Sequence, residues 1–381
     1  MPTQEARVAI PGSRDELAAE LSAAAEAGLS VRVRGAGTKL SWAGPASLEP
    51  ALELSTTRLD TLVEHNAGDL TAILEPGVPL ARAQSVFAEA GQMLPLDPPD
   101  HGATVGGIVA SADSGPLRSR YGGVRDLVVG MHVALSDGTR SKSGGKVIKN
   151  VAGYDLAKLF TGSFGSLGVI LELAVRLQPL PPATATAVGR SRDAGGLADA
   201  ASAVGHASIE HSGLDVRWEN GEGTVLARFG GAAPAPQAEG AARLLRDAGL
   251  DTDVVDEDDG LWSAQREAQR ARAGEPDTIV RVGALQTDLS RLLAAATRHS
   301  ALLVGRAPLG LSWLRLEDPD AAPDALRELR GIAGTVVLDA PAEVRERVDP
   351  WGERDAAVLA LMRRVKEGFD PSGVCAPGVL V

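Results

Sequence analysis

The sequence predicts an α+β protein of two domains. Its 381 residues are too many for one ordinary hydrophobic core. A Pro- and Ala-rich stretch from Gln178 to Thr186 marks the clearest break between two parts. On both sides of this break, short β-branched segments alternate with Ala- and Leu-rich segments of helical period. The second part runs through this alternation twice, which favours one antiparallel sheet with helices on one face.

In the first part, polar and glycine breaks separate the expected elements. Ser13 is a typical N-cap for the Ala-rich helix that follows it, and Gly28 ends that helix. We expect strands at residues 7–10, 29–34, 48–54, 71–74, 126–135 and 169–177, helices at 14–27 and 80–90, a helix start or tight turn at 104–110, a loop at 144–153 and a helical turn at 154–160.

In the second part, Asn220-Gly221 predicts the tight turn of a hairpin. We expect strands at residues 215–219, 224–229, 252–255, 278–282, 302–306, 311–316 and 335–338, and helices at 237–248, 261–272, 288–298 and 322–332. An amphipathic helix at 354–368 ends the chain, and its tail is expected to pack back on the first part.

Composition excludes several classes of function. The net charge of −12 argues against non-specific nucleic-acid binding. The single cysteine, Cys375, leaves no internal disulfide framework and no multi-cysteine metal or iron–sulfur site in this chain. No segment reaches the roughly 18 apolar residues of a membrane span, and the first residues lack the pattern of a secretory signal. We therefore expect a cytoplasmic protein without direct membrane insertion.

Glycine clusters indicate a ligand that lies along exposed backbone. They occur at residues 35–37, 102–115 and 162–168, and such clusters suit a phosphate-bearing ligand held by N–H groups. The turn at residues 35–39 lacks the third glycine of a dinucleotide fingerprint, so an anion nest fits it better. Residues 144–146 fail as a Walker A motif because Arg140 and Val147 stand at key positions. A loop-rich domain in a Gly-rich protein remains the alternative.

Lysine is rare and clustered. The chain has 6 Lys against 32 Arg, and Lys142, Lys146, Lys149 and Lys158 fall within one short stretch. A compact ammonium and a planar guanidinium serve different purposes, so this cluster hints at a site requirement, with chance clustering as the alternative.

Several motifs together resemble one family. They are RGAGTK (34–39), LPLDPP (94–99), ATVGGIVA (103–110), SGPLRSRYGGVRD (114–126), GGKVIKNVAGYDLAKL (144–159), GSFGSLGVI (162–170) and VKEGFDPSG (365–373). This set is similar to the FAD-binding PCMH-type (vanillyl-alcohol oxidase) flavoprotein superfamily, and within it to the FAD-binding E subunits of bacterial glycolate oxidases.

The resemblance implies FAD between two α+β subdomains, about residues 1–56 and 57–180, with an α+β cap domain at 181–345 and a C-terminal helix and tail at 346–381 that returns to the FAD domain. The loop at 35–39 has no histidine and the loop of His101 matches no linkage site, so the FAD is expected to be non-covalent. By motif position the cofactor-binding residues are Arg34, Gly35, Ala36, Gly37, Thr38 and Lys39 at the pyrophosphate, Thr104, Gly106, Gly107, Ser111, Ser114 and Gly115 along the ribityl–pyrophosphate path, and Gly165, Gly168 and Val169 near the adenosine.

The sequence departs from catalytic relatives in two places. None of its six histidines lies in a His-rich metal segment of the GDGN type, so no metal is expected. This agrees with an E subunit, which works beside a catalytic flavoprotein subunit and an iron–sulfur subunit. The usual Asn-Pro-Gly near the C-terminus reads Ala376-Pro377-Gly378, which leaves the contact between tail and flavin open.

The resemblance implies oxidation of glycolate, a 2-hydroxy acid, to glyoxylate by hydride transfer to flavin N5, or relay of its electrons. The catalytic candidates are Lys149, Asn150 and Tyr154, and Arg315 or Arg217 would bind the carboxylate. Tyr154 packing its own loop and solvated cap arginines are the alternatives. A stand-alone FAD-linked dehydrogenase of another hydroxy acid or alcohol and a non-catalytic flavin-bearing scaffold remain open. The protein would be cytoplasmic, or held at the membrane through its partners.

Overall fold

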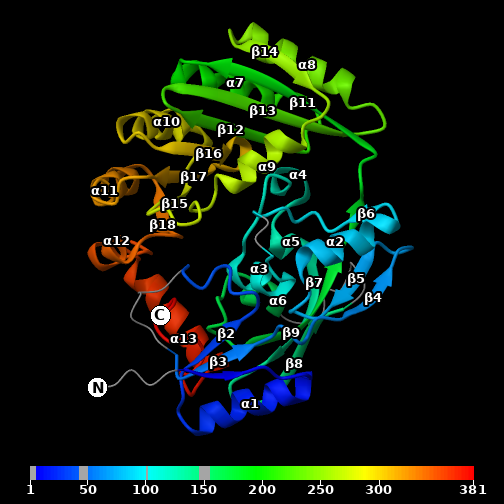
Figure 1. Cartoon of the computed structure of the whole chain (residues 1–381), viewed down its shortest axis with the longest axis vertical. Helices are drawn as coiled ribbons and strands as arrows, with labels where there is room; N and C mark the ends of the chain where they lie inside the picture. The colour runs from blue at the N-terminus through cyan, green and yellow to red at the C-terminus, as the bar shows by residue number, and fades with distance from the viewer. Residues whose placement is uncertain (1–5, 43–49, 100–101, 146–154) are drawn as a thin grey trace.

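The computed structural model describes residues 6–42, 50–99, 102–145 and 155–381. It contains four sheets, of three, two, eight and five strands. Figure 1 shows the eight-stranded sheet and its helices at one end of the molecule and the smaller sheets at the other. We call residues 6–179 the N-terminal unit and residues 183–347 the cap. The α+β class with an antiparallel cap sheet is confirmed, whereas the domain boundaries stay predictions.

The three-stranded sheet at the start of the chain is parallel. Its order is β1 (Arg7–Ala9), β3 (Leu52–Ser55), β2 (Val31–Arg34). Helix α1 (Arg14–Glu26) begins where Ser13 Oγ accepts a hydrogen bond from the Glu16 N–H. The helix buries Leu17 and Leu21 completely in the core that it shares with this sheet. The sheet delivers the chain from β2 into the glycine turn at residues 35–39.

The five-stranded sheet is antiparallel and carries the other half of the N-terminal unit. Its order is β4 (Leu62–Asn66), β5 (Thr71–Leu74), β9 (Val169–Arg176), β7 (Val128–Ala134), β8 (Arg140–Gly144). Five helices accompany it: α2 (Leu80–Glu89), α3 (Val105–Ser111), α4 (Arg118–Tyr121), α5 (Val124–Leu127) and α6 (Leu156–Phe160). A small ribbon of β6 (Gln92–Met93) and β10 (Gln178–Pro179) completes the unit.

One strand of this unit starts later than the sequence predicts. We expected a strand from Asp126, but residues 124–127 form the short helix α5 and the strand begins at Val128. The Asp126 carboxylate accepts a hydrogen bond of 2.8 Å from the Gly123 N–H. This local capping contact competes with extended backbone, which the β-branched composition alone does not reveal.

The cap is built on one antiparallel sheet of eight strands. Its order is β14 (Asp251–Val255), β11 (Ala183–Ser191), β13 (Glu222–Gly231), β12 (Gly213–Glu219), β16 (Leu302–Arg306), β17 (Leu311–Leu316), β15 (Thr278–Gly283), β18 (Gly334–Val337). The predicted Asn220-Gly221 hairpin is confirmed, and both residues have positive φ, of 53° and 77°. Strand β11 begins at Ala183, inside the Pro- and Ala-rich stretch that we interpreted as the break between the two parts.

Helices cover both faces of the cap sheet, not one as predicted. On one face, α7 (Ala194–His206), α8 (Ala235–Asp247), α10 (Leu289–Arg298) and α11 (Ala322–Ile332) share the largest apolar core with the strands. Helix α9 (Asp259–Glu267) lies on the other face, where Trp262 packs against Val188 and Leu226. Figure 1 places α9 between the sheet and α4 of the N-terminal unit. Short helical turns at 286–288 and 307–309 and helix α12 (Ala342–Arg347) complete the cap.

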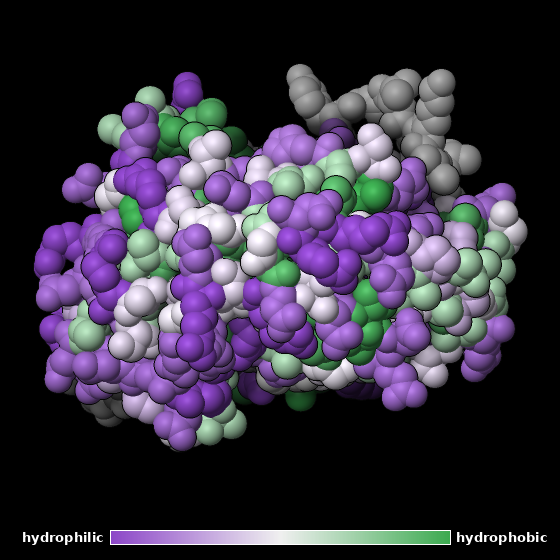
Figure 2. Space-filling view, turned by 90° about the horizontal axis from the view of Figure 1, so that it is seen from above, coloured by the Kyte–Doolittle hydropathy of each residue, from purple (hydrophilic) through white to green (hydrophobic). Residues whose placement is uncertain are grey.

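The outer surface of the cap end is mainly polar. Figure 2, which views the molecule from above this end, shows hydrophilic residues with small, separated apolar patches. This pattern is typical of amphipathic helices whose apolar faces pack on a sheet. Among the helices that the structure describes, none combines the length and apolar character needed to cross a bilayer.

The C-terminal helix α13 (Ala356–Phe369) returns the chain to the N-terminal unit. Beyond it, Val31 of β2 donates its N–H to the Val374 carbonyl at 2.7 Å and accepts from the Ala376 N–H at 2.8 Å. The Lys366 ammonium contacts the Asp370 carboxylate at 2.8 Å. Asp370 in turn accepts from the Cys375 N–H at 2.8 Å. The tail is therefore tied to the first residue of β2, the strand that leads into the glycine turn.

Replacing Asp370 with Ala is expected to loosen this tail. The change leaves the Lys366 ammonium without its carboxylate and the Cys375 N–H without an acceptor, which costs about 3 kcal/mol of unfolding free energy. Urea unfolding measures the loss. Glu367→Ala, on the exposed side of α13, is the control and should change the free energy by less than about 0.5 kcal/mol. Equal losses in the two variants would contradict the role assigned to Asp370.

Candidate functional site

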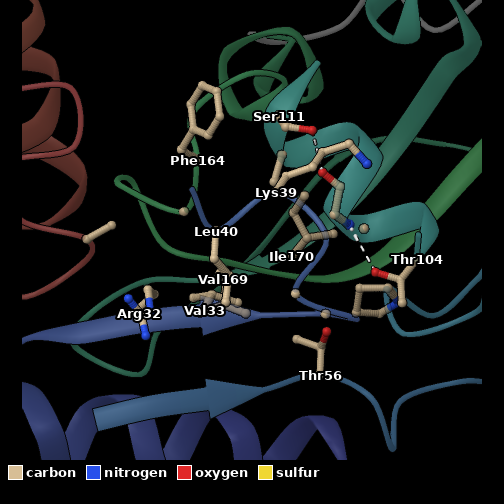
Figure 3. Close-up of a pocket in the computed structure, with 18 of the residues that line it drawn as sticks. Arg32, Val33, Lys39, Leu40, Thr56, Thr104, Ser111, Phe164, Val169 and Ile170 are labelled. Atoms are coloured by element: carbon tan, nitrogen blue, oxygen red, sulfur yellow. Dashed lines mark hydrogen bonds between the residues drawn. The ribbon is translucent and has the colours of Figure 1, made fainter. Parts of the chain in front are cut away.

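A groove lies between β2 and α3, with the C-terminal tail along its edge (Figure 3). Its walls come from segments far apart in the sequence. The three-stranded sheet, the five-stranded sheet and the C-terminal tail bring these segments together. The lining residues are Arg32, Val33, Gly35, Ala36, Gly37, Thr38, Lys39, Leu40, Trp42, Thr56, Pro76, Thr104, Gly106, Gly107, Ala110, Ser111, Ser163, Phe164, Gly165, Gly168, Val169, Ile170, Ala376 and Val379.

The turn after β2 offers backbone donors to this groove. Within the part of the chain that the structure describes, the N–H groups of residues 35–39 donate no hydrogen bond to another protein group. Backbone N–H groups need an acceptor, and consecutive free ones in a turn form a site for an anion. The turn therefore fits the phosphates of a nucleotide cofactor.

The first turn of α3 is different, although its glycines also face the groove. The Val105 N–H donates to the Val78 carbonyl at 2.9 Å, and the Gly106 N–H donates to the Pro76 carbonyl at 2.9 Å. The Gly107 N–H is 3.3 Å from Thr104 Oγ1, the contact drawn in Figure 3. These amides are already satisfied within the protein. The glycines here permit close packing between protein segments. An anion would therefore bind at the turn of residues 35–39.

Close contact between the two walls explains why the turn needs glycine. A Cβ added to Gly35 would lie 2.2 Å from Thr104 Oγ1 at the start of α3. Gly37 has a φ of +82°, which residues with a Cβ rarely adopt. A larger residue at position 35 would push the turn away from α3 and widen the groove.

Most of the sequence-predicted cofactor residues meet in this groove. Gly35, Ala36, Gly37, Thr38, Lys39, Thr104, Gly106, Gly107, Ser111, Gly165, Gly168 and Val169 line it, and their contact with FAD stays a prediction. Arg34, Ser114 and Gly115 do not line it. Arg34 instead forms an ion pair with Glu53 at 2.8 Å. A Cβ on Gly115 would lie 1.6 Å from the Asp97 carbonyl oxygen, so this glycine serves a close approach of protein to protein.

The catalytic candidates Lys149, Asn150 and Tyr154 lie outside the described residues. The two predicted carboxylate-binding arginines lie away from the groove. Arg217, on β12, forms an ion pair with Glu219 at 2.9 Å, and Arg315, on β17, lies near Glu317. Neither residue lines the groove or the small cavity beside it.

This second cavity lies between the N-terminal unit and the cap and holds two arginines that the sequence analysis missed. Arg118 comes from α4 and Arg281 from β15. Burial and the neighbouring Arg118 both lower the pKa of Arg281. Among the described residues, the Arg281 side chain forms neither a hydrogen bond nor an ion pair. The lining residues are Trp42, Ala112, Asp113, Ser114, Arg118, Arg281, Leu311, Trp313 and Leu338.

Strand alternation explains the position of Arg281. Val280 and Val282 point into the main cap core, so Arg281 points to the opposite face, toward the N-terminal unit. A single charge between two buried valines was the signal in the sequence, but the sequence alone does not tell which element covers that face.

A buried ion pair separates the groove from the second cavity. The Lys39 ammonium lies 3.2 Å from the Asp113 carboxylate, and the two side chains are only 8% and 4% exposed. Lys39 lines the groove and Asp113 lines the cavity. Burial lowers the pKa of Lys39, and Asp113 opposes this shift. Within the described residues, no group of three or more His, Cys, Asp or Glu side chains gathers in a way that would hold a metal ion.

Comparison with known proteins agrees with this geometry. Residues 6–144 match the family described as FAD binding domain. This match bears out the expected likeness of this part of the chain to PCMH-type FAD-binding domains. The cofactor is therefore FAD, and the open amides at residues 35–39 are suited to its pyrophosphate.

Two curated relatives and one solved structure are informative. The chain is 36% identical to the glycolate oxidase subunit GlcE of Escherichia coli over 178 residues, 44% of this chain and half of that subunit. It is 26% identical to an uncharacterized FAD-linked oxidoreductase of Mycobacterium tuberculosis (MT2338), over 100% of this chain and 91% of the relative. An alkyldihydroxyacetonephosphate synthase structure matches the fold with a TM-score of 0.71 at 14% identity, covering 97% of this chain and 76% of the synthase.

Replacing Gly35 with Ala is expected to weaken FAD binding about tenfold or more. The added Cβ overlaps Thr104 Oγ1, and relieving such an overlap costs about 1–3 kcal/mol. Titration of the flavin-free protein with FAD, followed by flavin fluorescence, measures the change. Gly260→Ala in α9, where an added Cβ meets no atom within 4 Å, is the control and should bind as the wild type does. Unchanged affinity in Gly35→Ala would contradict the assignment of the groove.

The pH dependence of stability is expected to reflect Asp97. Burial raises its pKa to about 7, although Arg306 and Arg266 oppose the shift. The folded protein then binds more protons than the unfolded chain between about pH 4 and pH 7, so the unfolding free energy falls as pH rises through this range. Asp97→Asn removes this contribution to the pH dependence, which changes the unfolding free energy by up to about 4 kcal/mol over the whole range. Urea unfolding at several pH values tests this, and parallel curves for the two proteins would contradict it.

Proposed function

We propose that the protein is an FAD-dependent oxidoreductase that acts on a small 2-hydroxy acid, with glycolate oxidised to glyoxylate as the expected reaction. The observation that carries the proposal is the cavity of Arg118 and Arg281 beside the FAD groove. A guanidinium binds a carboxylate through parallel N–H donors, and the guanidinium of Arg281 has no protein partner within the described residues.

The lining of the cavity has the chemistry that a small carboxylate needs. Trp42, Trp313 and Leu338 form its apolar part, and the two arginines provide its positive charge. A 2-hydroxy acid has one carboxylate for the arginines and a short carbon chain for the apolar wall. The ion pair of Lys39 and Asp113 lies between this cavity and the groove, so the substrate would bind close to the cofactor.

Bound FAD would supply the oxidising chemistry, the uptake of one hydride (a proton with two electrons) from the substrate carbon. The chain itself has to bind the carboxylate, exclude water and remove the hydroxyl proton. Lys149, Asn150 and Tyr154 remain the proposed residues for the proton and for orienting the hydroxyl. The two tryptophans and the cap strands would shield the cavity from water.

We place this chain in a hetero-oligomer as the FAD-binding subunit of a glycolate oxidase complex. The likeness to GlcE supports this role, and it covers half of that subunit. The proposed partners are a catalytic flavoprotein subunit and an iron–sulfur subunit, either of which would receive the electrons. We propose a cytoplasmic location, at the membrane only through such partners. A flavin-bearing scaffold without turnover is the alternative within this complex.

A stand-alone FAD-linked dehydrogenase of another hydroxy acid is the second candidate. It is favoured by the likeness to the mycobacterial FAD-linked oxidoreductase, which extends over the whole chain and 91% of the relative. The two candidates differ in what the purified chain does alone. A stand-alone enzyme reduces its flavin with substrate and passes electrons to a soluble acceptor, whereas a subunit needs its partners for at least one of these steps.

Arg281→Met is expected to weaken the response to substrate. Anaerobic addition of glycolate or D-lactate to the FAD-loaded protein should bleach the flavin absorbance. The variant should need about 10–150 times more substrate for half of the effect, because a hydrogen bond between charged groups contributes about 1.5–3 kcal/mol. Arg217→Met, at the cap arginine paired with Glu219, is the control and should respond as the wild type does.

Two results would contradict the proposal. If Arg281→Met and the wild type needed the same substrate concentration to bleach the flavin, the carboxylate would not bind in this cavity. A flavin that stays oxidised with both acids, alone and after addition of candidate partner subunits, would remove the hydroxy-acid activity and leave the scaffold.

A further inference from the structure

The cap holds the same loop that carries the free backbone donors of the groove. Trp42, three residues after this turn, is 4% exposed and packs among residues of the cap. Its cap neighbours are Ala268, Ile279, Leu302, Val304, Trp313 and Leu338. Trp42 thus anchors the loop of the N-terminal unit in the face of the cap sheet that is turned toward it.

Two charged residues of the cap fasten this anchor. Arg270, just after α9, donates from Nη2 to the Thr38 carbonyl at 2.7 Å and from Nε to the Asp339 carboxylate at 2.8 Å. The other oxygen of Asp339 accepts from Trp42 Nε1 at 3.1 Å and from Ser41 Oγ at 2.9 Å. The guanidinium also lies 5.2 Å from the centre of the Trp42 ring. One Arg–Asp pair therefore contacts the loop at Thr38, Ser41 and Trp42.

This arrangement is specific because its members are buried. The side chains of Arg270 and Asp339 are 12% and 10% exposed. Buried charges are costly unless every donor and acceptor is matched. Here the loop supplies a backbone carbonyl, a hydroxyl and an indole N–H to the pair. If the loop moved away, the pair would lose these partners, and if the pair were removed, the loop would lose its support.

We propose that Arg270 and Asp339 are positioning residues for FAD, which hold the turn at residues 35–39 open toward the pyrophosphate and couple FAD binding to the docking of the cap. Thr38 is itself a groove residue, and its carbonyl accepts the bond from Arg270. The inference rests on the assignment of the FAD groove and does not depend on the substrate.

The coupling has to be reciprocal. If cap docking strengthens FAD binding, FAD strengthens cap docking by the same factor, and such factors are typically about 5–150. FAD should therefore protect the cap residues around Arg270 and Asp339 from hydrogen exchange, although the cofactor would lie in the N-terminal unit. A purely structural role for the ion pair predicts lower stability without this response to FAD.

The test measures FAD affinity and hydrogen exchange in the full-length protein. Arg270→Gln should weaken FAD binding about tenfold or more in a fluorescence titration and should remove the FAD-dependent protection of residues 264–270 and 338–339. Arg270→Lys keeps the charge but lacks the planar guanidinium that reaches both acceptors. Its affinity for FAD should lie between that of the wild type and that of Arg270→Gln. The double variant Arg270→Met/Asp339→Leu removes both charges of the pair together and should show the same uncoupling in a folded protein.

A matched ion pair within the cap provides the control. Arg228 contacts Asp258 at 2.7 Å, with side-chain exposures of 14% and 0%, and has no contact with the groove. Arg228→Gln should lower the stability of the cap but keep wild-type FAD affinity and FAD-dependent protection. The proposal is overturned if the Arg270 variants bind FAD as tightly as the wild type, or if Arg228→Gln weakens FAD binding equally. Failure to oxidise any hydroxy acid would leave this test unaffected.

Discussion

The buried ion pair of Lys39 and Asp113 is the contact around which the two sites are arranged. Lys39 belongs to the loop after β2, and Asp113 follows the end of α3. The cap supports both sides of this pair. Arg270 donates to the carbonyl of Thr38, next to Lys39, and Arg306 donates to the carbonyl of Ser114, next to Asp113, at 2.9 Å. The distance between the walls of the groove therefore depends on how the cap is seated.

The contact between the N-terminal unit and the cap contains buried charges that need their partners. Arg306 is 1% exposed and lies 4.1 Å from the centre of the Trp313 ring. Its guanidinium also faces Asp97 and Asp215, and burial raises the pKa of Asp215 to about 6. Buried charges that depend on partners across an interface contribute little net stability, but removing one partner is expensive. This favours a single seating of the cap, which is what a site divided between two units requires.

Local features could be predicted from the sequence, and long-range pairings could not. The Asn220-Gly221 hairpin and the Ser13 cap follow from turn and capping chemistry, and half of the groove residues follow from the motifs that carry the family resemblance. Gly115 shows the limit, because a glycine indicates that something approaches the backbone without telling whether it is a ligand or, as here, Asp97. Arg118, Arg270, Arg281 and Arg306 gain their roles from contacts between the N-terminal unit and the cap. Only Arg281 has a local signal, the single charge between two valines, and even there the sequence does not tell which element covers that face of the strand.

Hydrogen exchange of the N-terminal unit with and without FAD is the most direct test of where the pyrophosphate binds. The amides of residues 35–39 have no protein acceptor within the described chain, whereas those of residues 105–107 are already bonded. We expect FAD to slow exchange strongly at residues 35–39 and to change it little at residues 105–107. Strong new protection at residues 105–107 with none at residues 35–39 would contradict this expectation and move the anion to the start of α3.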